Sequence, residues 1–136
     1  MKALVLSNGE LKEKEIKNTL EDLQEIVGGY IEIPYLSREF NENGIDVVIN
    51  EEGKLIEGLE PEIAIVDKET NAVLDIVYGN CAFVSHDDEG NTTELNAEQI
   101  KMVKDKLKMD VVLYDKNADR HYLVRVLFIW WKNINC

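Results

Sequence analysis

The chain has 136 residues, of which 45% are hydrophobic and 31% are charged, and its formal net charge is −12. This composition is typical of a folded globular protein and excludes a disordered one, and no apolar run approaches the roughly 18 residues that a membrane-spanning helix needs. Residues 1–97 hold 22 acidic and 7 basic side chains, whereas residues 98–136 hold 5 and 8, so the acidic surface argues against duplex nucleic acid as a partner.

The N-terminal segment predicts a β-hairpin. Residues 2–6 are apolar and strand-forming, and residues 11–16 alternate in part between apolar and charged side chains. Between them stands Asn8-Gly9, a dipeptide that readily adopts the positive backbone angles of a tight hairpin turn. The first apolar stretch is too short for a signal peptide, so we expect the protein to stay in the cytoplasm of the host cell.

A helix and a third strand are predicted after the hairpin. Apolar residues recur at helical spacing over residues 20–27, and Asn18 can cap the first turn. Gly28 can take the left-handed conformation that ends a helix, and Gly29 lets the backbone reverse without a clash. Residues 30–35, which come next, have the composition of a strand.

The middle of the chain predicts an exposed loop and several strands. Residues 37–44 are polar and rich in turn-forming residues, and residues 45–49 form a short apolar run typical of a strand. Residues 62–66 fit either a short strand or a helical turn. Residues 73–85 favour strand structure, and Gly79-Asn80 is expected to produce a bulge or a break between two strands.

The last third of the chain predicts a second helix and a final hairpin. Asn96 begins a helix-capping pattern, and apolar residues recur at helical spacing to about Met109. The strand-forming residues 111–114 and 122–131 are separated by a polar turn. The chain as a whole therefore predicts a single α+β domain, in which two α-helices pack on a mostly antiparallel β-sheet.

Six short blocks stand in the same order as in a known protein family. They are Met1-Lys2-Ala3-Leu4-Val5, Ile16-Lys17-Asn18-Thr19-Leu20-Glu21, Val27-Gly28-Gly29-Tyr30-Ile31-Glu32, Asn50-Glu51-Glu52-Gly53-Lys54, Asp75-Ile76-Val77-Tyr78-Gly79-Asn80 and Glu98-Gln99-Ile100. Over residues 1 to about 108 the chain resembles the domain of unknown function 3846 family, whose small proteins are carried by phages, prophages and conjugative elements. Residues 109–136 are expected to form a C-terminal hairpin extension. The resemblance implies a mobile-element origin, and genes of that kind often counter bacterial immunity.

The residues that commonly carry chemistry form no recognisable catalytic or metal-binding pattern. Cys81 and Cys136 have neither metal-ligand nor disulfide-framework spacing, and the sequence contains no phosphate-binding loop and no serine-hydrolase elbow. His86 stands beside two aspartates, but adjacent strand residues point to opposite faces, so a solvated turn is favoured over a metal site. We therefore expect a non-catalytic protein that needs no cofactor and no metal.

The basic C-terminal third contains the best candidate for a small-anion site. Arg120 and Tyr122 share one face of a predicted strand, where the guanidinium can bind phosphate and the ring can stack on a base. The alternative is an ordinary exposed strand whose arginine stems lie along apolar surface. The predicted ligand-binding residues are Arg120, Arg125, Tyr122, Phe83, Asn91 and Tyr30.

Residues 126–131 are large and apolar on both faces of the last predicted strand. A small domain has little core with which to cover both faces of such a strand, so we expect part of it to be buried between subunits. The predicted interface residues are Phe128, Trp130 and Trp131, and the predicted assembly is a homodimer or a higher even oligomer. Such an assembly would place the basic segment of one subunit against the acidic body of another.

Two hypotheses about function follow. The first is a mobile-element counter-defence protein that sequesters a nucleotide immune signal, such as a cyclic ADP-ribose isomer or a cyclic oligonucleotide, without turning it over. A small hydrolase would instead have to convert the bound nucleotide. The second hypothesis is an acidic inhibitor that mimics DNA on the basic surface of a host defence nuclease. Its charged display would consist of Glu51, Glu52, Asp87, Asp88 and Glu89.

Overall fold

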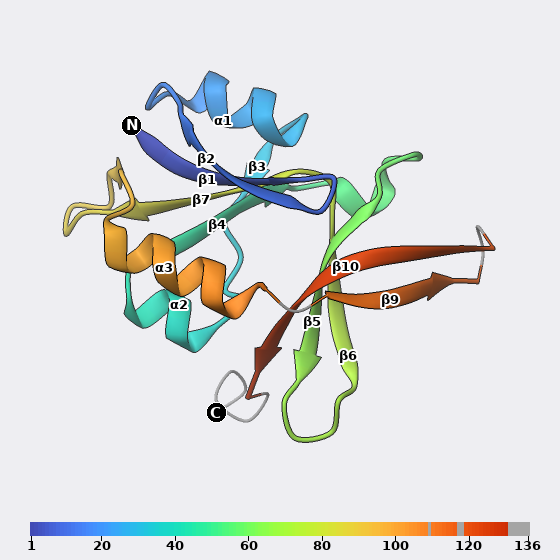
Figure 1. Cartoon of the computed structure of the whole chain (residues 1–136). Coiled ribbons are helices and arrows are strands. Elements are labelled where there is room, and N and C mark those ends of the chain that lie inside the picture. The colour runs from blue at the N-terminus through green and yellow to red at the C-terminus, as the bar shows by residue number, and fades with distance from the viewer. Residues whose placement is uncertain (109, 117–118, 131–136) are drawn as a thin grey trace.

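The computed structural model describes residues 1–108, 110–116 and 119–130. This part of the chain contains ten strands, three α-helices and one 3-10 helix (Figure 1), and none of its helices is long and apolar enough to cross a bilayer. In chain order the elements are β1 (Lys2–Ser7), β2 (Glu10–Glu15), α1 (Leu20–Val27), β3 (Ile31–Glu32), α2 (Arg38–Glu42), β4 (Ile45–Asn50), the 3-10 helix η1 (Gly53–Leu55), β5 (Pro61–Asp67), β6 (Val73–Tyr78), β7 (Cys81–His86), β8 (Thr92–Thr93), α3 (Ala97–Lys106), β9 (Asp110–Asp115) and β10 (Arg120–Ile129).

The strands form two sheets. The first sheet has the order β2-β1-β7-β4-β3, with β8 beside β7, and its pairings are antiparallel. The second has the order β6-β5-β10-β9, in which β5 and β10 are parallel and the other two pairings are antiparallel. The predicted α+β class with mostly antiparallel strands is confirmed, but the strands divide between two sheets. The predicted break at Gly79-Asn80 is the point where the chain passes from the second sheet to the first.

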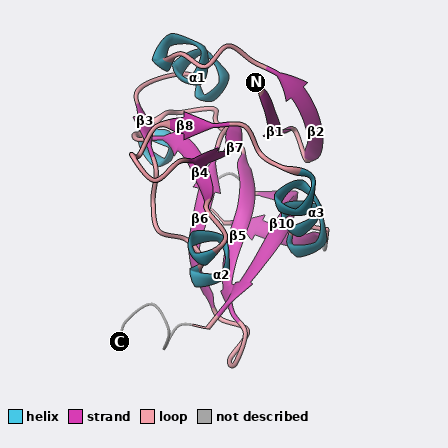
Figure 2. Cartoon of the chain, turned by 90° about the vertical axis from the view of Figure 1, so that its left-hand side faces the viewer, coloured by secondary structure: helices cyan, strands magenta, loops and turns pink. Residues whose placement is uncertain are grey.

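Different elements cover the two faces of the first sheet. Val5 and Val48 pack on one face with Leu23 and Val27 of α1. Side chains on the opposite face, among them the fully buried Phe83, pack with residues of the second sheet, α2 and α3. Alternate residues of β1, β4 and β7 therefore enter two separate apolar clusters. Figure 1 shows α1 above the first sheet and α2 and α3 below it, and Figure 2 likewise shows α1 apart from the other two helices.

The ends of α1 follow local chemistry. Gly28 ends the helix as predicted, and its φ of 83° lies in the left-handed region that favours glycine. The first turn is capped by Thr19 and not by the predicted Asn18, because the Thr19 hydroxyl accepts a hydrogen bond from the Asp22 amide at 3.1 Å. Asn18 instead donates its side-chain amide to the Thr92 carbonyl at 2.8 Å.

The prediction of an exposed loop over residues 37–44 is wrong, because α2 lies within it. Ser37 caps this short helix, and Phe40 is buried against Phe83, with ring centroids 6.3 Å apart and the rings nearly perpendicular. Three α-helices, rather than the predicted two, therefore pack on the sheets in the described residues. The third strand is also shorter than the predicted range of 30–35, since β3 has only two residues.

The C-terminal hairpin is an integral part of the second sheet. β10 lies between β5 and β9, and alternate side chains of β10 enter two different apolar clusters. Leu127 and Ile129 belong to the main core, whereas Val124 and Val126 pack on the other face of the sheet. β5, predicted at residues 62–66 as either a strand or a helical turn, is a strand whose seven residues are all buried. The last strands of the chain thus complete a sheet that begins near its middle.

Candidate functional site

Two of the predicted ligand-binding residues, Arg120 and Tyr122, lie together on the hairpin. Their side chains share one face of β10, and the guanidinium carbon of Arg120 lies 5.0 Å from the centre of the Tyr122 ring. One terminal nitrogen of Arg120 is 3.8 Å from the carboxylate of Glu60. An exposed ion pair of this length is weak, so the guanidinium remains accessible to a ligand.

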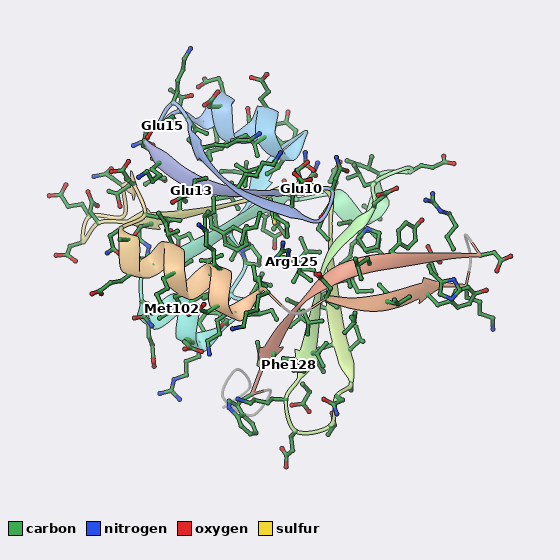
Figure 3. All side chains as sticks on the ribbon, in the orientation of Figure 1. Glu10, Glu13, Glu15, Met102, Arg125 and Phe128 are labelled. Carbon is green, nitrogen blue, oxygen red and sulfur yellow. The ribbon has the colours of Figure 1, made fainter. Side chains whose placement is uncertain are left out.

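Arg125 holds the fold together and does not face the predicted phosphate site. Its guanidinium donates two hydrogen bonds to the Gly9 carbonyl, at 3.0 and 3.1 Å, and one to the Leu107 carbonyl, at 2.6 Å. Figure 3 shows Arg125 at the centre of the molecule, where β10 passes the hairpin of β1 and β2. The side chain therefore fastens β10 to this hairpin and to the end of α3.

A buried carboxylate holds the same hairpin turn from β5. Glu62 is 4% exposed, and its two oxygens accept hydrogen bonds from the backbone amides of Asn8 and Gly9 at 2.8 and 2.9 Å. Burial raises the pKa of the Glu62 carboxyl, and the two amide hydrogen bonds oppose this shift. Glu62 and Arg125 together clamp the turn of the first sheet against the second sheet.

The other predicted ligand-binding residues lie apart from the pair on β10. Phe83 is fully buried in the main core, so its ring is not available to stack on a base. Asn91 lies in the turn between β7 and β8, where its side-chain amide donates to Asp87 at 3.2 Å. Figure 1 shows this turn at the left of the molecule, whereas β10 begins at the right. Tyr30 is 72% exposed beside β3, at a third location.

The predicted interface residues lie at the C-terminal end of β10. Phe128 is 37% exposed and Trp130 is 49% exposed, whereas Trp131 lies outside the described residues. Figure 3 shows Phe128 at the end of β10 that is away from the hairpin tip. The ammonium of Lys68 lies 5.4 Å from the centre of the Trp130 ring. Exposed aromatic side chains of this kind suit a contact with another protein, and the oligomer stays a prediction.

A cleft that the sequence did not reveal gathers residues from three of the family-like blocks. It has a volume of about 290 Å³ and is lined by residues of β3, β4, η1 and β6. Block 27–32 contributes Glu32, all five residues of block 50–54 line the cleft, and block 75–80 contributes the four residues 75–78. We call this site the signature cleft. The three blocks meet because β3 pairs with β4 and η1 packs against β6.

Close contacts fix the walls of the signature cleft. The buried side-chain amide of Asn50 donates to the Val27 carbonyl at 3.1 Å and accepts from the Glu52 amide at 2.8 Å. A methyl group on Gly53 would stand 2.8 Å from the Tyr78 carbonyl oxygen, so η1 can approach β6 this closely only because residue 53 lacks a side chain. The structure of the cleft walls therefore explains why residue 50 is asparagine and residue 53 is glycine. It does not explain why the residues beside them, Glu51, Glu52 and Lys54, are charged.

The signature cleft is acidic and has an apolar rim. The Asp75 carboxylate is ion-paired with Lys54, whereas the apolar side chain of Leu55, which lines the cleft, is 84% exposed. In the described ranges, no group of three or more His, Cys, Asp or Glu residues is placed to hold a metal ion. An acidic cleft with apolar edges suits a basic, partly apolar segment of another molecule. The exposed carboxylates of the cleft belong to Glu32, Glu51, Glu52 and Asp75.

The second acidic group predicted for a DNA mimic lies elsewhere. Residues 87–89 are exposed in the turn between β7 and β8. The pKa of the Asp87 carboxyl is lowered, and the main cause is the hydrogen bond that this carboxylate accepts from the backbone amide of Asn91 at 2.8 Å. β4 starts beside the C-terminal end of β7, next to this turn, and its last residue, Asn50, lines the signature cleft. The two acidic groups therefore lie at opposite ends of the first sheet and do not form one continuous display.

The fold and the site define a small α+β protein with two packed sheets and an acidic cleft built from blocks far apart in the sequence. The family described as domain of unknown function (DUF3846) matches residues 1–108, and the chain belongs to this family. No curated protein and no solved structure matches the chain. The family match ends just before β9, although β10 completes the second sheet.

Proposed function

We propose that the protein is a non-catalytic binding protein of mobile-element origin, which acts in the host cytoplasm by occupying a basic surface of a host defence protein. The signature cleft supports this proposal, because three family-like blocks meet there around exposed carboxylates and an apolar rim. The net charge of −12 favours attraction to a basic surface. A defence nuclease is a suitable target, since a groove that binds nucleic acid is basic.

Binding of a cationic peptide to the signature cleft tests this function. The probe is a fluorescent peptide of about a dozen residues in which arginine and leucine alternate, and fluorescence anisotropy gives its Kd. Replacing Glu51 and Glu52 together by glutamine should weaken binding about tenfold, which corresponds to a loss of roughly 1.4 kcal/mol of interaction with the arginines. The affinity of the unmodified protein should also fall as the salt concentration rises.

A matched control separates the signature cleft from net charge. Asp88→Asn together with Glu89→Gln removes the same number of charges at the opposite end of the first sheet. This control should weaken peptide binding less than about twofold, because the remaining acids of the cleft are untouched. Equal weakening by both pairs of substitutions would show that only total charge matters, and the assignment of the cleft would fail.

A second candidate function is the sequestration of a nucleotide immune signal, which the accessible Arg120 above the Tyr122 ring favours. A ligand present at a hundred times its Kd stabilises the folded state by about 2.7 kcal/mol and should raise the Tm by several degrees. The measurement is a thermal scan against cyclic dinucleotides and cyclic ADP-ribose isomers. Arg120→Ala should abolish the shift, whereas Lys116→Ala, which removes another exposed cation of the hairpin, should preserve it. An unchanged Tm across the whole panel would eliminate this candidate.

A further inference from the structure

β9 is an edge strand of the second sheet. In the part of the chain that the structure describes, it pairs with β10 on one side and with no strand on the other. Figure 1 shows the β9–β10 hairpin reaching out from the body of the molecule. One row of backbone N–H and C=O groups along β9 thus faces away from the sheet, and such a row is a template on which another strand can pair.

The middle of β9 lacks the features that commonly protect strand edges, and its two charged residues, Asp110 and Asp115, stand at its ends. Residues 111–114 contain neither lysine nor proline, and their pairing with β10 has no bulge. Val112 and Tyr114 are 66% and 49% exposed, and Leu123, opposite Val112 on β10, is 65% exposed. At the other edge of the sheet, β6 carries Asp75, and its pairing with β5 contains two register shifts. We therefore expect β9 to be the edge that is covered when the protein assembles.

We propose that β9 pairs with β9 of a second copy of the chain, antiparallel and about a two-fold axis. Because hydrogen-bonded and non-hydrogen-bonded pairs alternate along an antiparallel ladder, a strand that pairs symmetrically with its own copy has one residue opposite itself. With Leu113 on the axis, Val112 stands opposite the partner's Tyr114 and Asp110 stands opposite the partner's Lys116. The two second sheets then form one continuous sheet across the dimer.

The charges at the ends of β9 favour a second copy over an unrelated strand. Asp110 lies at the start of the strand and Lys116 directly after its end, so reversing the strand brings opposite charges together. Placing Val112 on the axis would instead set Asp110 opposite the partner's Tyr114. That register leaves both charges without an oppositely charged neighbour across the new pairing, so Leu113 is the favoured centre.

Cysteine cross-linking tests the register. Leu113→Cys, in a chain that also carries Cys136→Ser, should form a disulfide-linked dimer when it is oxidised with glutathione disulfide. Residues directly opposite each other in an antiparallel ladder have Cα atoms about 5 Å apart, which suits a disulfide. The remaining native Cys81 is buried, and burial also raises its thiol pKa, so it should not react.

Val111→Cys in the same background is the matched control. Residue 111 lies on the same face of β9 as residue 113. In each of the two chains, however, residue 111 lies two positions from the axis, so the Cα atoms of the two cysteines would be about 14 Å apart. That separation is too long for a disulfide. On a non-reducing gel we expect roughly half or more of the Leu113→Cys chains, and fewer than about a tenth of the Val111→Cys chains, to be linked.

Sedimentation equilibrium gives a readout that needs no engineered cysteine. The unmodified protein should sediment at micromolar concentration with twice the chain mass of 15.6 kDa. Val112→Lys should be a monomer with an unchanged circular dichroism spectrum, because a lysine on a strand edge opposes edge-to-edge pairing. A monomeric unmodified protein, or preferential cross-linking of Val111→Cys, would overturn the proposal.

The contact at β9 is separate from the interface predicted at Phe128 and Trp130. β9 begins opposite Arg125, so both aromatic residues lie beyond the part of β10 that β9 accompanies. Phe128→Ala should therefore leave the sedimenting mass unchanged, and a loss of the dimer in this variant would move the interface away from β9. The contact also does not involve the signature cleft, so Glu51→Gln with Glu52→Gln should not change the mass either.

Discussion

A chain that ends at residue 108 is expected to be largely unfolded at 25 °C, although residues 1–108 are the part that the family matches. The truncation removes β10, which fills one side of β5 and contributes to two apolar clusters. Burial of four such side chains contributes roughly 6–12 kcal/mol, which is comparable to the whole stability of a typical domain. The buried side chains that the truncation removes are Val124, Val126, Leu127 and Ile129.

A chain that ends at residue 130 is the control for this truncation, because it retains β10 and Trp130. It should give a well-dispersed amide NMR spectrum and a cooperative urea transition, whereas the shorter chain should give neither. If the shorter chain were to show dispersed resonances and a sharp transition, residues 1–108 would fold without β9 and β10, and the central position of β10 would not be needed for stability.

Arg125→Leu is expected to lower the free energy of unfolding by about 3 kcal/mol, because hydrogen bonds from a charged group to two backbone carbonyls are lost inside the fold. The affected carbonyls belong to Gly9 and Leu107, and Leu107 is fully buried. Arg125→Lys should recover less than half of this loss, since an ammonium group cannot reproduce the planar fork that reaches both carbonyls. Urea unfolding at one fixed protein concentration provides the measurement.

Arg120→Leu is the matched control on the same strand. Its guanidinium is exposed and makes a weak ion pair with Glu60 and a contact with the Tyr122 ring, so the substitution should change the free energy of unfolding by less than about 1 kcal/mol. Similar losses in both variants would contradict a bracing role for Arg125. Because Arg125 stabilises the fold, a loss of nucleotide binding in an Arg125 variant would reflect destabilisation of the protein and not a lost contact with the ligand.

Local chemistry explains the parts of the fold that the sequence predicted correctly. Asn8 and Gly9 have φ values of 53° and 80°, as the hairpin turn between β1 and β2 requires. Asn96 and Gln99 exchange two hydrogen bonds at the start of α3, and this capping box needs only residues within one turn. The helix α2 could not be predicted in this way, because Phe40 is its one buried residue and five residues give no helical period.

Pairings between distant segments explain what the sequence could not show about the candidate site. In the sequence, Arg125 resembles an ordinary strand arginine, since the carbonyls that it binds lie far away along the chain. Phe83 lies in a strand that is central in the first sheet, which buries its ring. The signature cleft forms because Gly53 lets η1 approach β6. The available signal was the concentration of glycine, asparagine and glutamate in three separate family-like blocks.

The parallel pairing of β5 with β10 also means that the second sheet can be completed only late in the synthesis of the chain. Ile63 pairs opposite Arg125, so almost half of the chain must be synthesised between the two partners. Until β9 and β10 leave the exit tunnel, β6 is the only described strand beside the buried strand β5, and long-range pairings of this kind slow folding. Pulse-labelling of nascent chains arrested at successive lengths should therefore show protection of the β5 amides that pair with β10 only after β10 has emerged.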